Sequence, residues 1–233
     1  MIFVIKNEKL RRFLRYALPF VLIPAVVALG VFVFDEKSYG FISLVVVIGA
    51  MALFCAGFEK RTVGTRRIIV IAVMTALSIL GRFVFAPIPG FKPITAMIVI
   101  TAIWLGGESG FLVGVLTVLI SNFYFGHGPW TPFQMFSFGM IGLIAGFLAK
   151  PLKKSRVALA LYGVFAGVIF SCIMDVWSVL WYENGFHPSL YWGALLTAAP
   201  YMLSYAVSNV IFLLLLGRPF GEKLERIKIK YGV

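Results

Sequence analysis

One carboxylate, Asp175, lies inside an otherwise apolar run of the chain. It shares a helical face with Ser171, Ser178 and Tyr182, because these residues recur at helical spacing. An ionised carboxylate in lipid costs about 2.5–3.5 kcal/mol even on insertion scales, so this face is expected to point into a bundle of helices. With one acid and no histidine on an apolar run, an acid–base pair inside a membrane is hard to assemble, and no catalytic residue is predicted.

A second charge, Arg82, lies about one turn from the end of an earlier apolar run, at a depth comparable to that of Asp175. Two interpretations remain open. The two residues form a structural ion pair, or one or both line an outward-facing cavity, as intramembrane charges often do.

Polar and aromatic residues also gather in three short loops expected on one side of the membrane, at 86–93, 121–134 and 182–188. Trp and Tyr are common membrane-interface anchors, but here Asn, Gln and His are interleaved with them. Aromatic walls with a few polar groups suit a moderately large organic ligand. The predicted substrate-binding residues are Arg82, Lys92, Asn122, Trp130, Gln134, Asp175, Tyr182, His187 and Tyr201.

Several catalytic motifs are missing from the sequence. There is no G-x-x-x-x-G-K-[ST] loop, so ATP hydrolysis is expected from partner subunits. H-E-x-x-H, G-x-S-x-G and C-x-x-C are absent too. Cys55 and Cys172 lie far apart in apolar runs and suggest neither a disulfide framework nor a metal site. We therefore expect no metal and no cofactor.

The composition predicts an all-α integral membrane protein. Hydrophobic residues make up 61% of the chain and charged residues 13%, against about half and a quarter in soluble domains. Because a span needs about 20 residues, we predict eight spans, although the fourth and fifth are short. These are Phe13–Phe34, Tyr39–Phe58, Ile68–Phe85, Ile94–Leu105, Gly110–Phe125, Phe133–Ala149, Val157–Tyr182 and Leu190–Leu216.

The basic residues predict the orientation of these spans. If the chain starts inside and crosses eight times, all but Lys37, Arg82 and Lys92 of the 21 Lys and Arg residues face the cytoplasm. Both termini are then cytoplasmic, in the plasma membrane of a prokaryote. The net charge of +12 is thus explained by topology rather than by nucleic-acid binding.

The chain divides into a plain hairpin at 1–60, a six-span core at 66–220 that carries the polar residues, and a basic tail at 221–233. Pairs of small residues four apart let helix backbones approach closely. For the glycine pairs, internal packing is the favoured interpretation. The pairs are Ala72/Ala76, Gly110/Gly114, Gly142/Gly146 and Gly163/Gly167.

Residues 66–217 resemble the S component, the substrate-binding membrane subunit of energy-coupling factor (ECF) vitamin transporters. The motifs are the run 66–82, Pro89-Gly-Phe-Lys-Pro93, Gly110-Phe-Leu-Val-Gly114, Ser121-Asn122 and Gly128-Pro-Trp-Thr-Pro-Phe-Gln-Met135. The block at 129–134 looks most like members assigned to cobalamin or related corrinoids.

This resemblance implies a six-helix bundle that binds a vitamin or vitamin precursor on its outer side. It also implies a membrane coupling subunit and two cytoplasmic ATPase subunits as partners, with Ala72 and Ala76 docking onto the coupling subunit. The hairpin at 1–60 departs from the six-helix pattern and must not cover that docking face.

Two other functions remain as alternatives. A self-contained secondary transporter would use Asp175 and Arg82 as a coupling pair, but the chain shows no evident inverted repeat. An intramembrane enzyme acting on lipid would need acids or histidines near a membrane surface, where the inner loops offer only Glu108.

Overall fold

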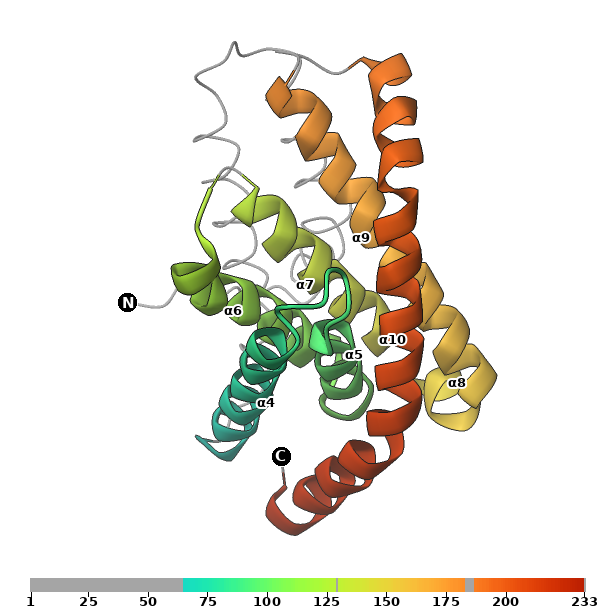
Figure 1. Cartoon of the computed structure of the whole chain (residues 1–233). Coiled ribbons are helices and arrows are strands. Elements are labelled where there is room, and N and C mark those ends of the chain that lie inside the picture. Colours follow the sequence, from blue (N-terminus) through green and yellow to red (C-terminus); the bar gives the residue numbers. More distant parts are fainter. Residues whose placement is uncertain (1–64, 129, 183–186, 233) are drawn as a thin grey trace, which may run out of the picture.

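The computed structural model describes residues 65–128, 130–182 and 187–232, so the predicted hairpin at 1–60 lies outside the described residues. Within these ranges the chain is helical, and no strand occurs (Figure 1). The helices are α4 (Thr65–Val84), α5 (Ile94–Leu105), α6 (Gly107–Phe125), α7 (Thr131–Phe147), α8 (Ala149–Lys154), α9 (Arg156–Tyr182) and α10 (Pro188–Tyr231).

The lengths and composition of these helices confirm an α-helical membrane protein. α4, α6, α9 and α10 are long and apolar enough to cross a membrane, whereas α5 and α7 are shorter. Below, the end of the bundle where α4 ends and α7 begins is called the outer end. The opposite end, which holds α8, is called the inner end. These names follow the orientation predicted from the basic residues.

The short helix α5 is the centre of the bundle. Every residue of α5 except Trp104 is buried, and α4, α6, α7, α8, α9 and α10 all contact it. Its 12 residues rise only about 18 Å, less than a bilayer core of roughly 30 Å. Because protein rather than lipid surrounds α5, its length does not have to match the membrane.

Glycines set the closest helix contacts. A Cβ on Gly142 of α7 would lie 2.5 Å from the Gly110 carbonyl carbon of α6, and one on Gly146 would lie 2.2 Å from Gly107 Cα. On α9, a Cβ on Gly167 would lie 2.8 Å from the Ala206 nitrogen of α10. The internal packing predicted for these pairs is therefore confirmed, since no side chain fits between the backbones.

At the inner end, Arg67 ties three helices together. Its guanidinium donates hydrogen bonds of 2.7 Å to the Leu105 carbonyl of α5 and to Ser109 Oγ of α6. These bonds fix the start of α4 against the turn between α5 and α6. No pattern in the sequence predicts this contact, because the residues are about forty positions apart.

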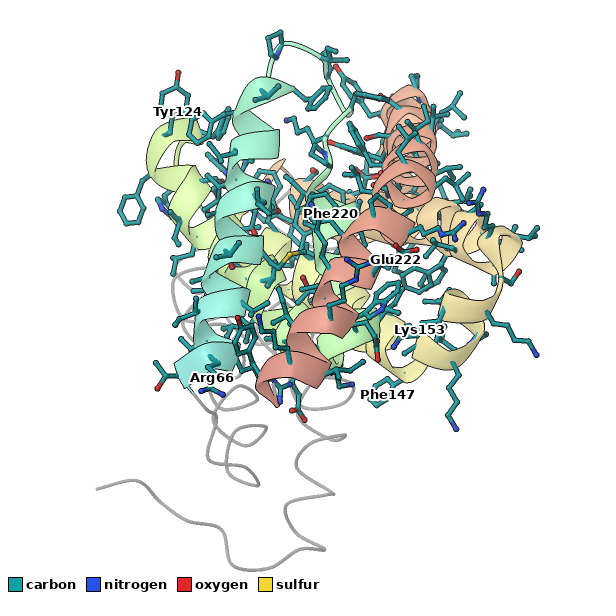
Figure 2. The ribbon with its side chains drawn as sticks, turned by 90° about the horizontal axis from the view of Figure 1, so that it is seen from below. Arg66, Tyr124, Phe147, Lys153, Phe220 and Glu222 are labelled. Atoms are coloured by element: carbon teal, nitrogen blue, oxygen red, sulfur yellow. The ribbon has the colours of Figure 1, made fainter. Side chains whose placement is uncertain are left out.

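The last helix is longer than its predicted span, which ends at Leu216. α10 continues past Pro219 to Tyr231, so residues 221–231 are helical rather than a separate tail. Figures 1 and 2 show this terminal part crossing beneath the bundle beside α4. Phe220, Leu224 and Ile227 recur at helical spacing and turn toward α4, which gives the segment an apolar face.

Candidate functional site

The outer end contains a chain of hydrogen bonds that begins at Arg82, in the last turn of α4. The Arg82 guanidinium donates to Asn122 Oδ1 at 2.7 Å and also to Ser121 Oγ, both on α6. It lies over the Phe125 ring, 4.4 Å from the centroid, in a cation–π contact. Two polar groups and one aromatic face therefore hold this half-buried cation.

Asn122 extends this network of hydrogen bonds to α7. Its side-chain amide donates to Gln134 Oε1 at 3.0 Å and to Thr131 Oγ1 at 3.2 Å. The residue is only 1% exposed, so an unmade hydrogen bond here would be costly. Asn122 thus orients Arg82 through its oxygen and Gln134 through its nitrogen.

The Arg82–Asp175 ion pair, one of the two interpretations of these charges, is not formed. Arg82 forms hydrogen bonds to α6 instead, and ion pairs form elsewhere among the described residues, for example Lys153–Glu225 and Arg218–Glu222. Asp175 Oδ2 is buried and accepts no hydrogen bond from the described residues. A role for these two charges in binding a ligand stays a prediction.

The loop between α4 and α5 is fixed to α10. The Lys92 backbone N–H donates to Ser208 Oγ at 2.8 Å, and the Ser208 hydroxyl donates to the Lys92 carbonyl at 3.1 Å. Ser204 Oγ donates to the Pro89 carbonyl at 2.9 Å. Gly90 has φ of +74°, and a Cβ there would lie 2.7 Å from Ser204 Oγ. Glycine is needed at this position for both reasons.

This anchoring places the Lys92 side chain beside Arg82. Lys92 Nζ lies 5.9 Å from the centroid of the Phe125 ring that Arg82 also covers. Burial lowers the pKa of Lys92, and the nearby positive charge of Arg82 lowers it further. Two cations sharing one aromatic ring make this corner attractive to a polar or anionic group of a ligand.

Aromatic residues join this corner to α9 and α10. Trp130, which precedes α7, contacts Trp177 of α9 edge-to-face, with centroids 5.7 Å apart. Phe170 of α9 contacts Tyr205 of α10 at 5.2 Å.

The structure thus brings together four of the nine predicted site residues. Arg82, Lys92, Asn122 and Gln134 form one polar group, and Trp130 contacts Trp177 on α9, the helix that also carries Asp175. Tyr201 is 56% exposed, and His187 is exposed at the start of α10. The side chain of Tyr182 lies outside the described residues.

The sequence-based prediction missed five residues that take part in the site. Ser121 and Thr131 stand in the quoted motifs but were not chosen, since a hydroxyl gives little signal by itself. Tyr205 shares a helical face with Tyr201, a spacing that is visible in the sequence, although Tyr205 is not among the predicted substrate-binding residues. Phe125 and Trp177 gave no signal distinct from ordinary interface aromatics.

The predicted docking residues lie elsewhere on α4. Ala72 and Ala76 are exposed, on the side of the helix opposite its buried residues, which include Met74 and Ser78. The pair therefore does not pack against the other described helices. No group of three or more potential metal ligands occurs among the described residues.

Comparison with known families decides the identity of the chain. The model of the family described as "ECF-type riboflavin transporter, S component" matches residues 62–226, well over half of the chain. The chain belongs to this family. As an S component it is a membrane-embedded, substrate-binding subunit of an ECF transporter and not an enzyme, and S components work with ECF modules and a small-molecule substrate.

Individual relatives of this S component are distant. It is 28% identical over 151 residues to a UPF0397 protein of Aliivibrio salmonicida. The aligned residues make up 63% of this chain and 79% of the relative. A UPF0397 protein of Clostridium perfringens is 27% identical over 185 residues, or 75% of this chain and 96% of the relative. No solved structure matches the chain.

Proposed function

We propose that this S component binds a vitamin at the outer polar cluster, defined as Arg82, Lys92, Asn122, Gln134 and Asp175. The observation that carries the proposal is the Arg82–Asn122–Gln134 chain of hydrogen bonds, bordered by aromatic residues. The chain holds a guanidinium and two amides in fixed orientations. Fixed polar groups among aromatic side chains are the usual composition of a small-molecule site.

Asp175 adds a requirement for the ligand. A buried carboxylate oxygen without a hydrogen-bond partner costs free energy, and a ligand hydroxyl or N–H that donates to Oδ2 would recover it. The proposed ligand therefore combines a ring system with at least one donor on its side chain. Ligand binding, rather than folding, is the proposed reason for this acid.

Two vitamins fit this description. The family is named for riboflavin. The planar ring of riboflavin has carbonyl and imide groups that can form hydrogen bonds with side-chain amides, and its side chain carries hydroxyl donors. The sequence block at 129–134 instead suggests a corrinoid such as cobalamin. We propose a flavin-type vitamin as the leading substrate, because amide groups and aromatic rings lie together at the outer end and Asp175 of α9 offers an unpaired acceptor.

Transport requires partners in this proposal. A membrane coupling subunit and two cytoplasmic ATPases would supply the energy, and the exposed strip containing Ala72 and Ala76 would dock onto the coupling subunit. Small residues on an exposed helix face allow a partner helix to approach closely, and dispersion contacts then hold it there.

The test is an equilibrium titration of the purified full-length protein with riboflavin and, separately, with cobalamin. Saturable binding of riboflavin at about one site per chain, with weaker or no cobalamin binding, is expected. Preferential binding of cobalamin would replace the flavin assignment. Uptake into liposomes by this protein alone, driven by a proton gradient, would overturn the S-component mechanism in favour of a secondary transporter.

A further inference from the structure

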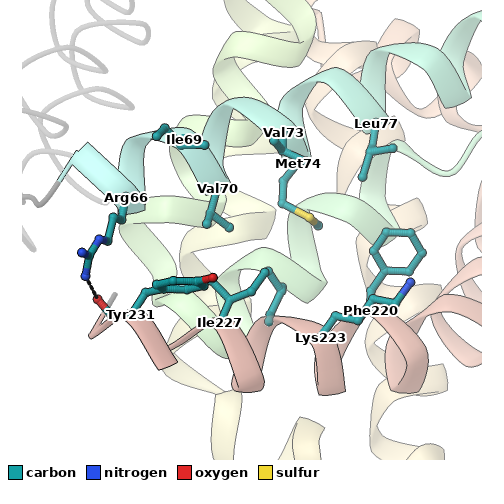
Figure 3. A pocket seen from close by; sticks show the side chains of 11 residues that line it. Arg66, Ile69, Val70, Val73, Met74, Leu77, Phe220, Lys223, Ile227 and Tyr231 are labelled. Atoms are coloured by element: carbon teal, nitrogen blue, oxygen red, sulfur yellow. Dashed lines mark hydrogen bonds between the residues drawn. The ribbon is translucent and has the colours of Figure 1, made fainter. Parts of the chain in front are cut away.

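A groove of about 640 Å³ lies at the inner end, between α4 and the terminal part of α10 (Figure 3). Val70, Met74 and Leu77 point from α4 toward Ile227 and Phe220 of α10. The walls of the groove are therefore apolar. The groove lies toward the inner end of the bundle, whereas the outer polar cluster lies at the outer end.

One end of the groove is basic. Arg66 donates a hydrogen bond of 3.1 Å to the Tyr231 carbonyl, and its guanidinium lies 5.6 Å from the Tyr231 ring centroid. Lys230 Nζ lies 5.3 Å from the same ring. Two exposed cations thus flank the aromatic residue that closes the groove.

The acidic residues in the terminal part of α10 form ion pairs with basic residues that do not line the groove. Glu222 pairs with Arg218 at 2.9 Å, and Glu225 pairs with Lys153 at 3.4 Å. Among the described residues that line the groove none is acidic, and the charged ones are Arg66 and Lys223. The groove therefore carries positive charge that the neighbouring carboxylates do not neutralise.

The groove also opens to the surroundings of the bundle. Ile69 and Val73, which line its side, are 56% and 51% exposed. From Arg66 to Leu77 it runs along α4 for about 17 Å, close to half of a roughly 30 Å bilayer core. One acyl chain of a lipid in the inner leaflet has this length and chemistry.

We propose that the groove binds an anionic phospholipid of the cytoplasmic leaflet. Its phosphate lies at Arg66 and Lys230, and one acyl chain lies along α4 between Val73 and Ile227. Basic pockets between helices on the cytoplasmic side are suited to anionic headgroups. The lipid would hold the terminal part of α10 against α4, and neither Ala72 nor Ala76 is among the described residues that line the groove.

The test is native mass spectrometry of the full-length protein, titrated in mild detergent with phosphatidylglycerol and with phosphatidylcholine. We expect one phosphatidylglycerol to bind in preference to phosphatidylcholine. Arg66→Gln with Lys230→Gln should weaken phosphatidylglycerol binding about tenfold or more. Val73→Trp, which fills the groove from its open side, should do the same.

Matched controls lie outside the groove. Lys150→Gln with Lys154→Gln removes the same charge from α8 at the same end. Leu80→Trp adds the same bulk to an exposed position seven residues along α4. Both should leave phosphatidylglycerol affinity within about twofold of the wild type.

Three results would overturn the proposal. The first is equal phosphatidylglycerol affinity in the wild type and in both groove variants. The second is displacement of phosphatidylglycerol by an equal concentration of glycerol phosphate, since the acyl chain would then contribute nothing. The third is loss of assembly with the coupling subunits in Val73→Trp while lipid binding is unchanged, which would make the groove a protein interface.

Discussion

Arg82 of α4 and Asn122 of α6 are joined by a hydrogen bond of 2.7 Å between the guanidinium and the side-chain oxygen, although they lie 40 residues apart. The amide nitrogen of Asn122 also donates a hydrogen bond to Gln134 on α7. One buried amide therefore positions a cation and a second amide at the outer end, where the proposed ligand binds.

Replacing Asn122 should weaken ligand binding strongly. Asn122→Ala removes a hydrogen bond to a charged group, worth about 1.5–3 kcal/mol, and frees both Arg82 and Gln134 to reorient. The expected loss of affinity is about 10- to 100-fold, measured by equilibrium titration.

Asn209→Ala is a matched control for this change. Asn209 is also buried, and its amide donates to the Gly163 carbonyl where α9 meets α10. This variant should lower the melting temperature without changing ligand affinity. Equal affinity losses in both variants would mean that the Asn122 effect is a general result of destabilisation.

Asp175 should be unfavourable for the ligand-free protein and useful for binding. In Asp175→Leu, the buried oxygen without a hydrogen-bond partner is removed, so the ligand-free protein should gain about 1 kcal/mol of stability. Ligand affinity should fall, because the acceptor for a ligand donor is lost. Thermal unfolding with and without ligand measures both effects, and a variant that is less stable without ligand would contradict the proposed role.

Bulky residues at the alanine strip should separate binding from transport. Ala72→Trp with Ala76→Trp should abolish assembly with the coupling subunits and ATP-driven uptake, because a partner helix can no longer approach closely. Affinity for the ligand should be retained, since the strip is exposed and lies away from the outer polar cluster.

Val157→Trp with Leu161→Trp is the control, because these residues are 69% and 65% exposed on a different helix, α9. Pull-down of the ATPase subunits should be normal for this control. If the alanine variant loses ligand binding together with assembly, the strip serves internal packing and the docking proposal fails.

Lys92 should give the protein an alkaline pH dependence of stability. Because its pKa is lowered in the folded protein, the unfolded chain holds the proton more tightly. The destabilisation is complete below the folded pKa and is relieved as pH rises toward the ordinary value of 10.5. The melting temperature of the wild type relative to Lys92→Met should therefore rise with pH across this window. Parallel pH profiles for the two proteins would exclude this contribution.

Helix bounds were predictable from the sequence where a proline or glycine lies at the end of the helix. α5 has the predicted bounds because Pro93 precedes it and Gly106, with φ of +98°, follows it. The end of α10 was not predictable in the same way. The predicted span ends with the apolar run at Leu216, but an apolar face on residues 220–231 continues the helix beside α4.

Four of the nine predicted site residues lie together in the structure, but their contacts could not be predicted from the sequence. Asn122 and Gln134 lie 12 positions apart across one loop, and both were chosen. The partner of Arg82 was not predictable, because it depends on how α4 is rotated against α6. That rotation follows from tertiary packing around α5, which spacing along one helix does not specify.

Mass spectrometry of the small molecules retained by gently purified full-length protein tests the central claim most directly. The wild type and the Arg82→Gln, Asn122→Ala variant are compared after identical purification. We predict that the wild type retains one vitamin at close to one molecule per chain, and that the variant, although monodisperse, retains little of it. Equal retention by both proteins, or a compound bound only at the inner groove, would contradict a ligand site at Arg82 and Asn122.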